Sequence, residues 1–152
     1  MSLTFKELFK GNVSASIRYS TSTAYDLSPS SRNISENSNK ELSVSGTFGR
    51  SGFEIPFFGL SLSNDIDISF SYSYSKNSRQ TFSTTEEITA KGTPGEGSSR
   101  SVMEPRIRYV LSARVTASLF YRYTTVTPDE GGSRIPGSST NEGGLDVHIA
   151  IQ

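Results

Sequence analysis

The chain has 152 residues, no cysteine, and 15 basic residues balanced by 15 acidic ones, so that its formal net charge is zero. Disulfides, thiolate catalysis and zinc–thiolate sites are thereby excluded, and no net field favours nucleic acid or an anionic membrane surface. Hydrophobic residues make up only 33% of the chain, below the usual share of about 45 to 50% even after allowing for glycine, so a thick two-sided core would be hard to fill.

The sequence has no signal for a membrane helix and no secretory leader at its start. No run approaches the ~18 consecutive apolar residues of a membrane helix, which leaves closed β-structure as the only spanning option. The opening stretch MSLTFKELFKG lacks a long apolar region and a small-residue cleavage site. We expect either a protein that stays inside the cell or a mature or internal piece of a longer exported chain. The one helical feature expected is an amphipathic turn near Leu3 to Phe9.

Six segments alternate between apolar and polar residues, the pattern of strands whose two faces differ. The first strand is expected at 13–27 and the second at 40–50. The third, at 65–77, contains DIDISFSYSYSK, in which Ile, Phe and Tyr alternate with Asp and Ser. Alternation alone describes both a soluble sandwich and a membrane barrel, because successive strand side chains point to opposite faces in either.

The second half of the chain adds three more strands, at 102–111, 115–125 and 144–152. Pro105 weakens the first of these, since proline cannot donate a ladder hydrogen bond. We therefore predict an all-β fold of about six antiparallel meander strands with long alternate loops, forming part of the wall of a transmembrane β-barrel.

The connections between these strands differ in length. Those after the first, third and fifth strands, SPSSRNISENSN, TTEEITAKGTPGEGSSRS and VTPDEGGSRIPGSSTNEGG, are long and polar, whereas the one after the fourth is only a few residues. Long extracellular loops opposite short periplasmic turns are typical of transmembrane barrels. The aromatic connection GRSGFEIPFFGLSLSN after the second strand departs from this pattern by its length. Six strands would place both termini on the periplasmic side.

Tyrosines gather toward the long-loop ends of the first, third and fifth strands. They are Tyr19, Tyr25, Tyr72, Tyr74, Tyr121 and Tyr123. Aromatic girdles occupy this position at the lipid–water boundary of barrels, although tyrosine also favours strands in general. We interpret them as a girdle.

The alternation assigns each strand a lipid-facing and a lumen-facing set. The lipid-facing candidates are Val13, Ile17, Tyr19, Leu42, Val44, Phe48, Ile66, Ile68, Phe70, Tyr72, Ile107, Tyr109, Leu119, Tyr121, Val147 and Ile149. The lumen-facing candidates are Ser14, Ser16, Arg18, Asp65, Asp67, Arg106, Arg108, Arg122, Asp146 and His148. Because the smallest free-standing barrels have about eight strands, the first and last strands must pair with strands outside this chain.

Candidate catalytic groups are weak. Asp65 and Asp67 lie about 7 Å apart on one strand face but lack a third ligand or a partner histidine, and we interpret them as a solvated rim. Asp146 and His148 share a face, yet one histidine in a serine-rich chain does not make a hydrolase triad. Arginines and tyrosines lie mostly on opposite faces, which argues against a nucleic-acid surface. We expect no enzyme, cofactor, metal or nucleic-acid partner.

Several segments carry a resemblance to a known family. LTFK followed by YSTSTAYDLS, then YVLSARVTASLFYRYTTVTP, and finally SSTNEGGLDVHIAIQ resemble the C-terminal end of the SprA/Sov family, the giant outer-membrane β-barrel of the Bacteroidetes type IX secretion system. The resemblance covers nearly the whole chain, and its motifs are strand and turn patterns. It implies that residues 1–152 are the last strands of a large barrel through which folded cargo crosses the outer membrane.

The resemblance also implies the partners. These would be outer-membrane lipid, the remaining barrel strands, secreted cargo, a shuttle protein and a plug protein. The chain ends in Ile151 and Gln152 instead of the aromatic residue common at the end of such barrels. Two alternatives stay open: a small outer-membrane barrel protein that closes by oligomerising, and a soluble serine-rich β-sandwich acting in surface adhesion or carbohydrate binding.

Overall fold

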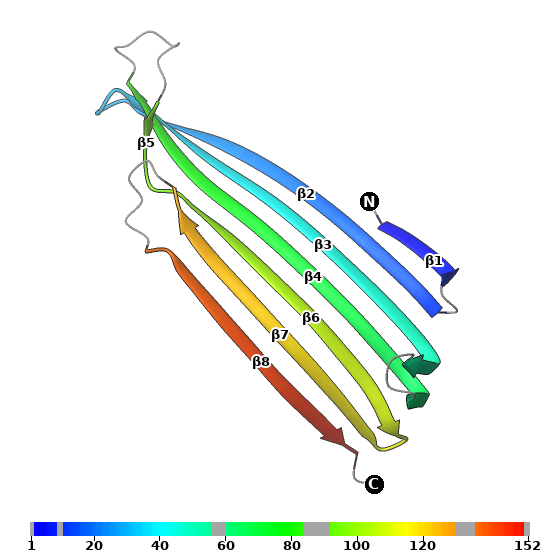
Figure 1. Cartoon of the computed structure of the whole chain (residues 1–152). Coiled ribbons are helices and arrows are strands. Elements are labelled where there is room, and N and C mark those ends of the chain that lie inside the picture. The colour runs from blue at the N-terminus through cyan, green and yellow to red at the C-terminus, as the bar shows by residue number, and fades with distance from the viewer. Residues whose placement is uncertain (1, 9–10, 56–59, 84–91, 130–135, 151–152) are drawn as a thin grey trace.

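The protein forms one open antiparallel β-sheet. A computed structural model describes residues 2–8, 11–55, 60–83, 92–129 and 136–150. The strands are β1 (Ser2–Leu8), β2 (Gly11–Ser28), β3 (Asn33–Ile55), β4 (Leu60–Ser83), β5 (Thr93–Pro94), β6 (Ser98–Ser112), β7 (Val115–Pro128) and β8 (Ser138–Ile149). The order across the sheet is β1-β2-β3-β4-β6-β7-β8, with β5 paired to β4. The all-β meander is confirmed, and Figure 1 shows it as a single curved layer with β1 and β8 at its two edges.

The first hairpin is longer than predicted. β2 and β3 pair without interruption from Asn12↔Gly49 to Ser28↔Asn33, and a turn at 29–32 contains Arg32 in the left-handed region, at φ 53°. Most of the segment SPSSRNISENSN, predicted to be a loop, is therefore strand. The alternation of apolar and polar residues stops where both faces of the hairpin are exposed to water, but the backbone hydrogen bonds between the strands continue. The sequence pattern therefore marks only part of each strand.

The connection after β3 was also predicted wrongly. β3 continues to Ile55 and β4 begins at Leu60, so that only residues 56–59 separate them. The register shifts between Ser51 and Phe53, where Gly52 has a φ of 67°. The bulge adds one residue to one of the two strands and so interrupts the alternation of apolar and polar side chains. The sequence therefore does not reveal that the strands continue beyond it. The β2–β3 turn at 29–32 is equally short, so the expected alternation of long and short connections is found only from β3 onward.

The N-terminal segment is a strand and not a helical turn. β1 pairs with β2 in the register Leu3↔Ala15 and Phe5↔Val13, and Phe9 lies outside the described residues. The ladder of β2 supplies hydrogen bonds that override the weak helical pattern of this short segment. With β1 and β5 the described sheet has eight strands instead of about six, and β8 begins at Ser138, ahead of the predicted 144, because its polar first half shows no apolar alternation.

The two ends of the sheet differ in their connections. Between β6 and β7 only residues 113–114 intervene, at the end of the sheet where the β3–β4 connection also lies. At the other end β4 and β6 are separated by residues 84–97, which include β5, and β7 and β8 by residues 129–137. Figure 1 shows β2, β3 and β4 extending together beyond β6 and β7 at this second end. We call these the short-turn end and the long-loop end.

The sheet has no second layer among the described residues. All described strands belong to one sheet, and the one buried hydrophobic residue among those whose side chains are described is Ile66, which is 7% exposed. No helix in the described part of the chain is long and apolar enough to cross a membrane. Both faces of the sheet are thus open.

Candidate functional site

The strand registers collect the predicted apolar side chains on one face. A single row of paired residues runs through Val13, Phe48, Ile68, Ile107, Leu119 and Leu145. A second row joins Ile17, Val44 and Tyr72, and a third joins Ile66, Tyr109 and Val147 through Ala117. Because directly paired residues point to the same side of a sheet, the sixteen lipid-facing candidates all share this side, which we call the apolar face.

The apolar face is exposed to a degree unusual for a folded protein. Leu145 is 66% exposed, and Ile17 and Leu119 are each 54% exposed. Burying a side chain of this size contributes about 1.5 to 3 kcal/mol relative to leaving it in water. A contiguous apolar surface of this kind marks an interaction surface on a soluble protein or a surface that contacts lipid.

Within the apolar face the apolar residues form a band with defined limits. On β3 the band runs from Leu42 to Phe48 and is bracketed on the same face by Lys40 and Arg50. The strand between the two cations is about 34 Å long at about 3.4 Å per residue. Tilted by about 35 to 45°, it would stand about 24 to 28 Å tall, and the lipid-facing band of transmembrane barrels is about 25 Å tall.

The band crosses the sheet obliquely. The row through Tyr19, at the long-loop edge of the band on β2, reaches Ser139 on β8, several residues before the band begins there at Leu145. The row through Val13, at the short-turn edge on β2, reaches Leu145, and the band continues to Ile149. Averaged from β2 to β8, the band shifts by about one residue per strand, which at a rise of about 3.4 Å and a strand spacing of about 4.8 Å corresponds to a strand tilt of about 35°.

Tyrosines mark the long-loop edge of the band. Tyr19 and Tyr74 lie in one row with Leu42 between them, Tyr72 and Tyr123 lie in the next row, and the Tyr121 hydroxyl donates a hydrogen bond to Asn141 Oδ1 at 2.6 Å. Five of the six tyrosines of the predicted girdle thus lie together, and their place at a lipid–water boundary stays a prediction.

Tyr25 does not belong to this edge of the band. It pairs with Glu36, beyond Lys40 toward the long-loop end, and is 67% exposed. At the opposite edge Tyr109, which the girdle prediction left out, lies in a row with Ile66.

The opposite side of the sheet, which we call the polar face, carries all ten lumen-facing candidates. On β2 and β3 it is a ladder of hydroxyls, in which Ser14 Oγ lies 2.6 Å from Thr47 Oγ1 and Ser16 Oγ lies 2.7 Å from Ser45 Oγ. Arg18 continues this column and pairs with Ser43. Because these side chains are short, they project little from the sheet, and this part of the polar face is open to water.

On β6, β7 and β8 the polar face carries a charge network. Glu104 accepts hydrogen bonds from Arg122 at 2.7 Å and from Arg106 at 3.1 Å, and Arg122 also reaches Glu142 at 3.3 Å. Phe120 is an aromatic residue on this face, and the Arg106 guanidinium lies 5.4 Å from its ring centroid. The network joins all three strands through side chains as well as through the backbone.

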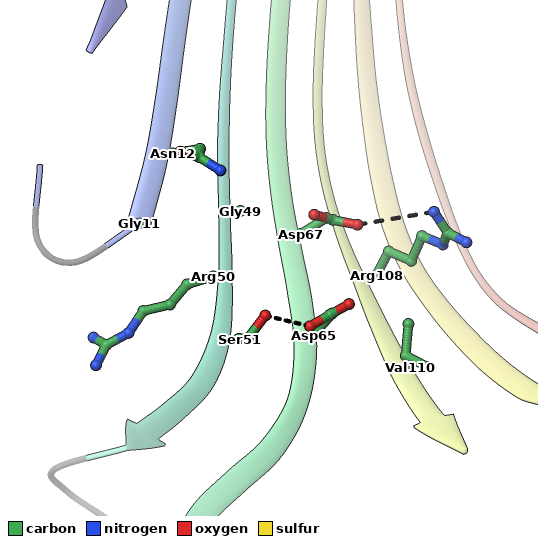
Figure 2. Close-up of a pocket in the computed structure, with 9 residues that line it drawn as sticks. All are labelled: Gly11, Asn12, Gly49, Arg50, Ser51, Asp65, Asp67, Arg108 and Val110. Carbon is green, nitrogen blue, oxygen red and sulfur yellow. Dashed lines mark hydrogen bonds and ion pairs between the residues drawn. The ribbon is translucent and has the colours of Figure 1, made fainter. Parts of the chain in front are cut away.

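Near the short-turn end the polar face is hollowed. The hollow measures about 800 Å³, and Figure 2 shows the side chains around it. Ser51 donates a hydrogen bond to Asp65, and Arg108 lies 3.8 Å from Asp67. Gly49 leaves room for the second carboxylate, since a Cβ there would lie 2.9 Å from Asp67 Oδ1. Each aspartate thus has a polar partner in the sheet, which fits the predicted rim.

No catalytic constellation forms among the described residues. Asp146 pairs with Ser118 and His148 with Thr116 in the β7–β8 ladder, and no hydrogen bond joins the aspartate to the histidine in the described structure. In the described part of the chain no group of three metal-ligating side chains comes together.

Comparison with protein-family models, with curated proteins and with solved structures finds no match to the chain. The resemblance to the SprA/Sov family therefore stays a prediction. Sequence reasoning missed one arrangement of charges, the direct pairing of Lys40 with Lys76 on the apolar face. The alternation places each lysine on this face, but only the register shows that they are neighbours.

Proposed function

We propose that the chain is a non-enzymatic segment of the wall of a bacterial outer-membrane β-barrel. Its apolar face contacts lipid and its polar face lines a water-filled lumen. The observation that carries this proposal is the oblique apolar band. Its slope corresponds to a strand tilt of about 35°, and its height is about 25 Å. Both values are those expected for the lipid-facing surface of a transmembrane β-barrel.

The edges of the sheet support a wall segment of a larger barrel. An open sheet in lipid would leave unpaired backbone groups at β1 and β8, each costing several kcal/mol. Strands from the rest of the barrel, in the same longer chain or in other subunits, would pair with these edges. The polar face supports a wide lumen, because its serines and threonines are too small to fill a barrel interior.

The transport role is proposed from the resemblance to the SprA/Sov family together with this wide polar face. The segment would form part of a type IX protein-secretion translocon, and cargo, a shuttle protein and a plug protein would meet the polar side of the barrel. The wall acts passively: hydroxyls and paired charges keep the path hydrated, so that a folded cargo protein passes without binding tightly to it.

A charge placed on either face tests the proposal. Ile68→Arg, within the band, should block assembly in the outer membrane, because an arginine on the lipid face costs up to about 2 to 4 kcal/mol. Ser71→Arg is the matched control, because Ser71 pairs with Glu104 on the polar face and an arginine there meets water and a carboxylate. The measurement is the amount of folded full-length protein, produced from the complete reading frame, in isolated outer membranes.

Two results would contradict the proposal. One is an equal membrane yield of the two variants. The other is wild-type protein recovered folded and monomeric without detergent, since a soluble sandwich would behave in this way and Ile68→Arg would then unfold a protein that was never in the membrane.

A further inference from the structure

The apolar face changes its chemistry abruptly beyond the tyrosine edge. Lys40 follows Leu42 toward the long-loop end, and Lys76 follows Tyr74 in the same row. Thr21 pairs with Lys40 on one side and Ser99 pairs with Lys76 on the other. Four residues whose side chains can donate hydrogen bonds thus stand in one row, about 5 to 7 Å along the strands beyond the last apolar residues.

The two lysines are an unfavourable pair in the absence of an anion. Directly opposite residues in an antiparallel sheet have Cβ atoms about 4.5 to 5.5 Å apart, and like charges at this distance destabilise the sheet. Lys76 is partly compensated, because its Nζ lies 3.1 Å from Asp129 Oδ1. Lys40 is exposed and has no ion-pair partner among the described residues. The row therefore keeps one uncompensated positive charge.

A hollow lies beside this row. It measures about 430 Å³ and is lined by residues that include Lys76, Ser78, Gln80, Pro94, Pro128 and Asp129. The Asp129 side chain, which lines the hollow, lies directly against Gly97, because a Cβ at position 97 would lie only 2.6 Å from the Asp129 carboxylate. The backbone of Asp129 is fixed by a hydrogen bond of 3.0 Å to the Gly97 carbonyl. Donors, positive charge and space of headgroup size thus occur together.

We propose that Lys40 and Lys76 bind the phosphate group of an anionic membrane lipid, with its headgroup in the adjoining hollow. This proposal rests on the proposed function, because it needs the apolar band to lie in a bilayer. The lipid source is favoured over a free phosphate ion by position: the acyl chains of a lipid held here would lie along the tyrosine edge and the band below it. Lysine stems can follow apolar surface while the ammonium reaches the headgroup level.

The test is lipid binding to the full-length protein purified from membranes in detergent. A phosphatidylglycerol with a fluorescent acyl chain is titrated against wild type, Lys40→Ser/Lys76→Ser and Arg100→Ser. Arg100 is the matched control, because it pairs with Ser75 on the polar face at nearly the same height. Wild type and Arg100→Ser should bind equally, and the double variant about thirtyfold more weakly, given about 1 kcal/mol for each of the two basic side chains at a membrane surface.

Phosphatidylcholine with the same acyl chain should bind all three proteins weakly, and millimolar inorganic phosphate should displace little of the phosphatidylglycerol. Equal binding by the double variant and wild type would overturn the site, as would complete displacement by inorganic phosphate, which would assign it to a free ion. Failure of the proposed function is seen separately, because wild type would then be recovered without membranes in the first step.

Discussion

At the scale of single residues, an aromatic ring and a glycine meet across two strands of the polar face. A Cβ on Gly144 would lie 2.7 Å from Phe120 Cε1, so the ring lies over the glycine. The Arg106 guanidinium lies over the same ring. A phenylalanine on a polar face would otherwise expose its ring to water, and the glycine lets it lie flat against β8. The contact also pins the β7–β8 register, because one residue of slippage would remove it.

This contact gives a prediction with an adjacent control. Gly144→Ala should displace the Phe120 ring and lower the free energy of unfolding by about 1 kcal/mol, the low end of the usual cost of overpacking. Gly143→Ala should leave stability unchanged or raise it slightly, because the nearest atoms to a Cβ there lie 3.5 and 3.7 Å away. Urea unfolding of the membrane-inserted protein measures both. Equal stability of the two variants would mean that the ring does not lie over Gly144.

At the scale of elements, the sequence predicted the strands well wherever the two faces meet different surroundings. The predicted strand 115–125 begins at the first residue of β7, and all sixteen lipid-facing candidates lie on one face. The pattern failed where that difference disappears: in the polar outer half of the β2–β3 hairpin, in the first half of β8, and at the bulge beside Gly52. The sequence pattern also could not predict the register, because pairing across strands depends on residues far apart in the sequence, as Lys40 and Lys76 show.

The bulge beside Gly52 can be tested directly. Gly52 has a φ of 67°, and a side chain in this left-handed region costs about 1 to 2 kcal/mol. Gly52→Ala should lower the free energy of unfolding by about this amount. Gly46→Ala is the control, since Gly46 lies in regular strand and the nearest atom to a Cβ there is 3.8 Å away. Tolerance of Gly52→Ala at the level of Gly46→Ala would show that the bulge does not need a left-handed residue.

At the scale of the whole molecule, the account joins three features of the sheet. The apolar face has no covering layer among the described residues, β1 and β8 are open edges, and the apolar band is oblique. A partner protein could cover an apolar face, but it would not require a band that slopes, on average, by about one residue per strand. A bilayer requires both the height and the slope, because the strands of a barrel are tilted in it.

The slope makes a specific prediction about membrane depth. Val13, Ile107 and Leu145 lie in a single row of paired residues, yet the band places them differently. Val13 should lie near the short-turn boundary of the hydrocarbon layer, Ile107 near its centre and Leu145 near the long-loop boundary. The chain contains no cysteine, so each position can carry one spin label in this segment of the full-length protein.

The most direct test of the central claim is the collision rate of these three labels with oxygen and with a water-soluble nickel chelate in membranes. A fourth label at Ser71, on the polar face, is the control. We predict the highest ratio of oxygen to nickel collisions at Ile107, intermediate ratios at Val13 and Leu145, and the lowest ratio at Ser71. Equal depth along the row, or a label at Ile107 that meets neither reagent, would contradict a tilted barrel wall facing lipid.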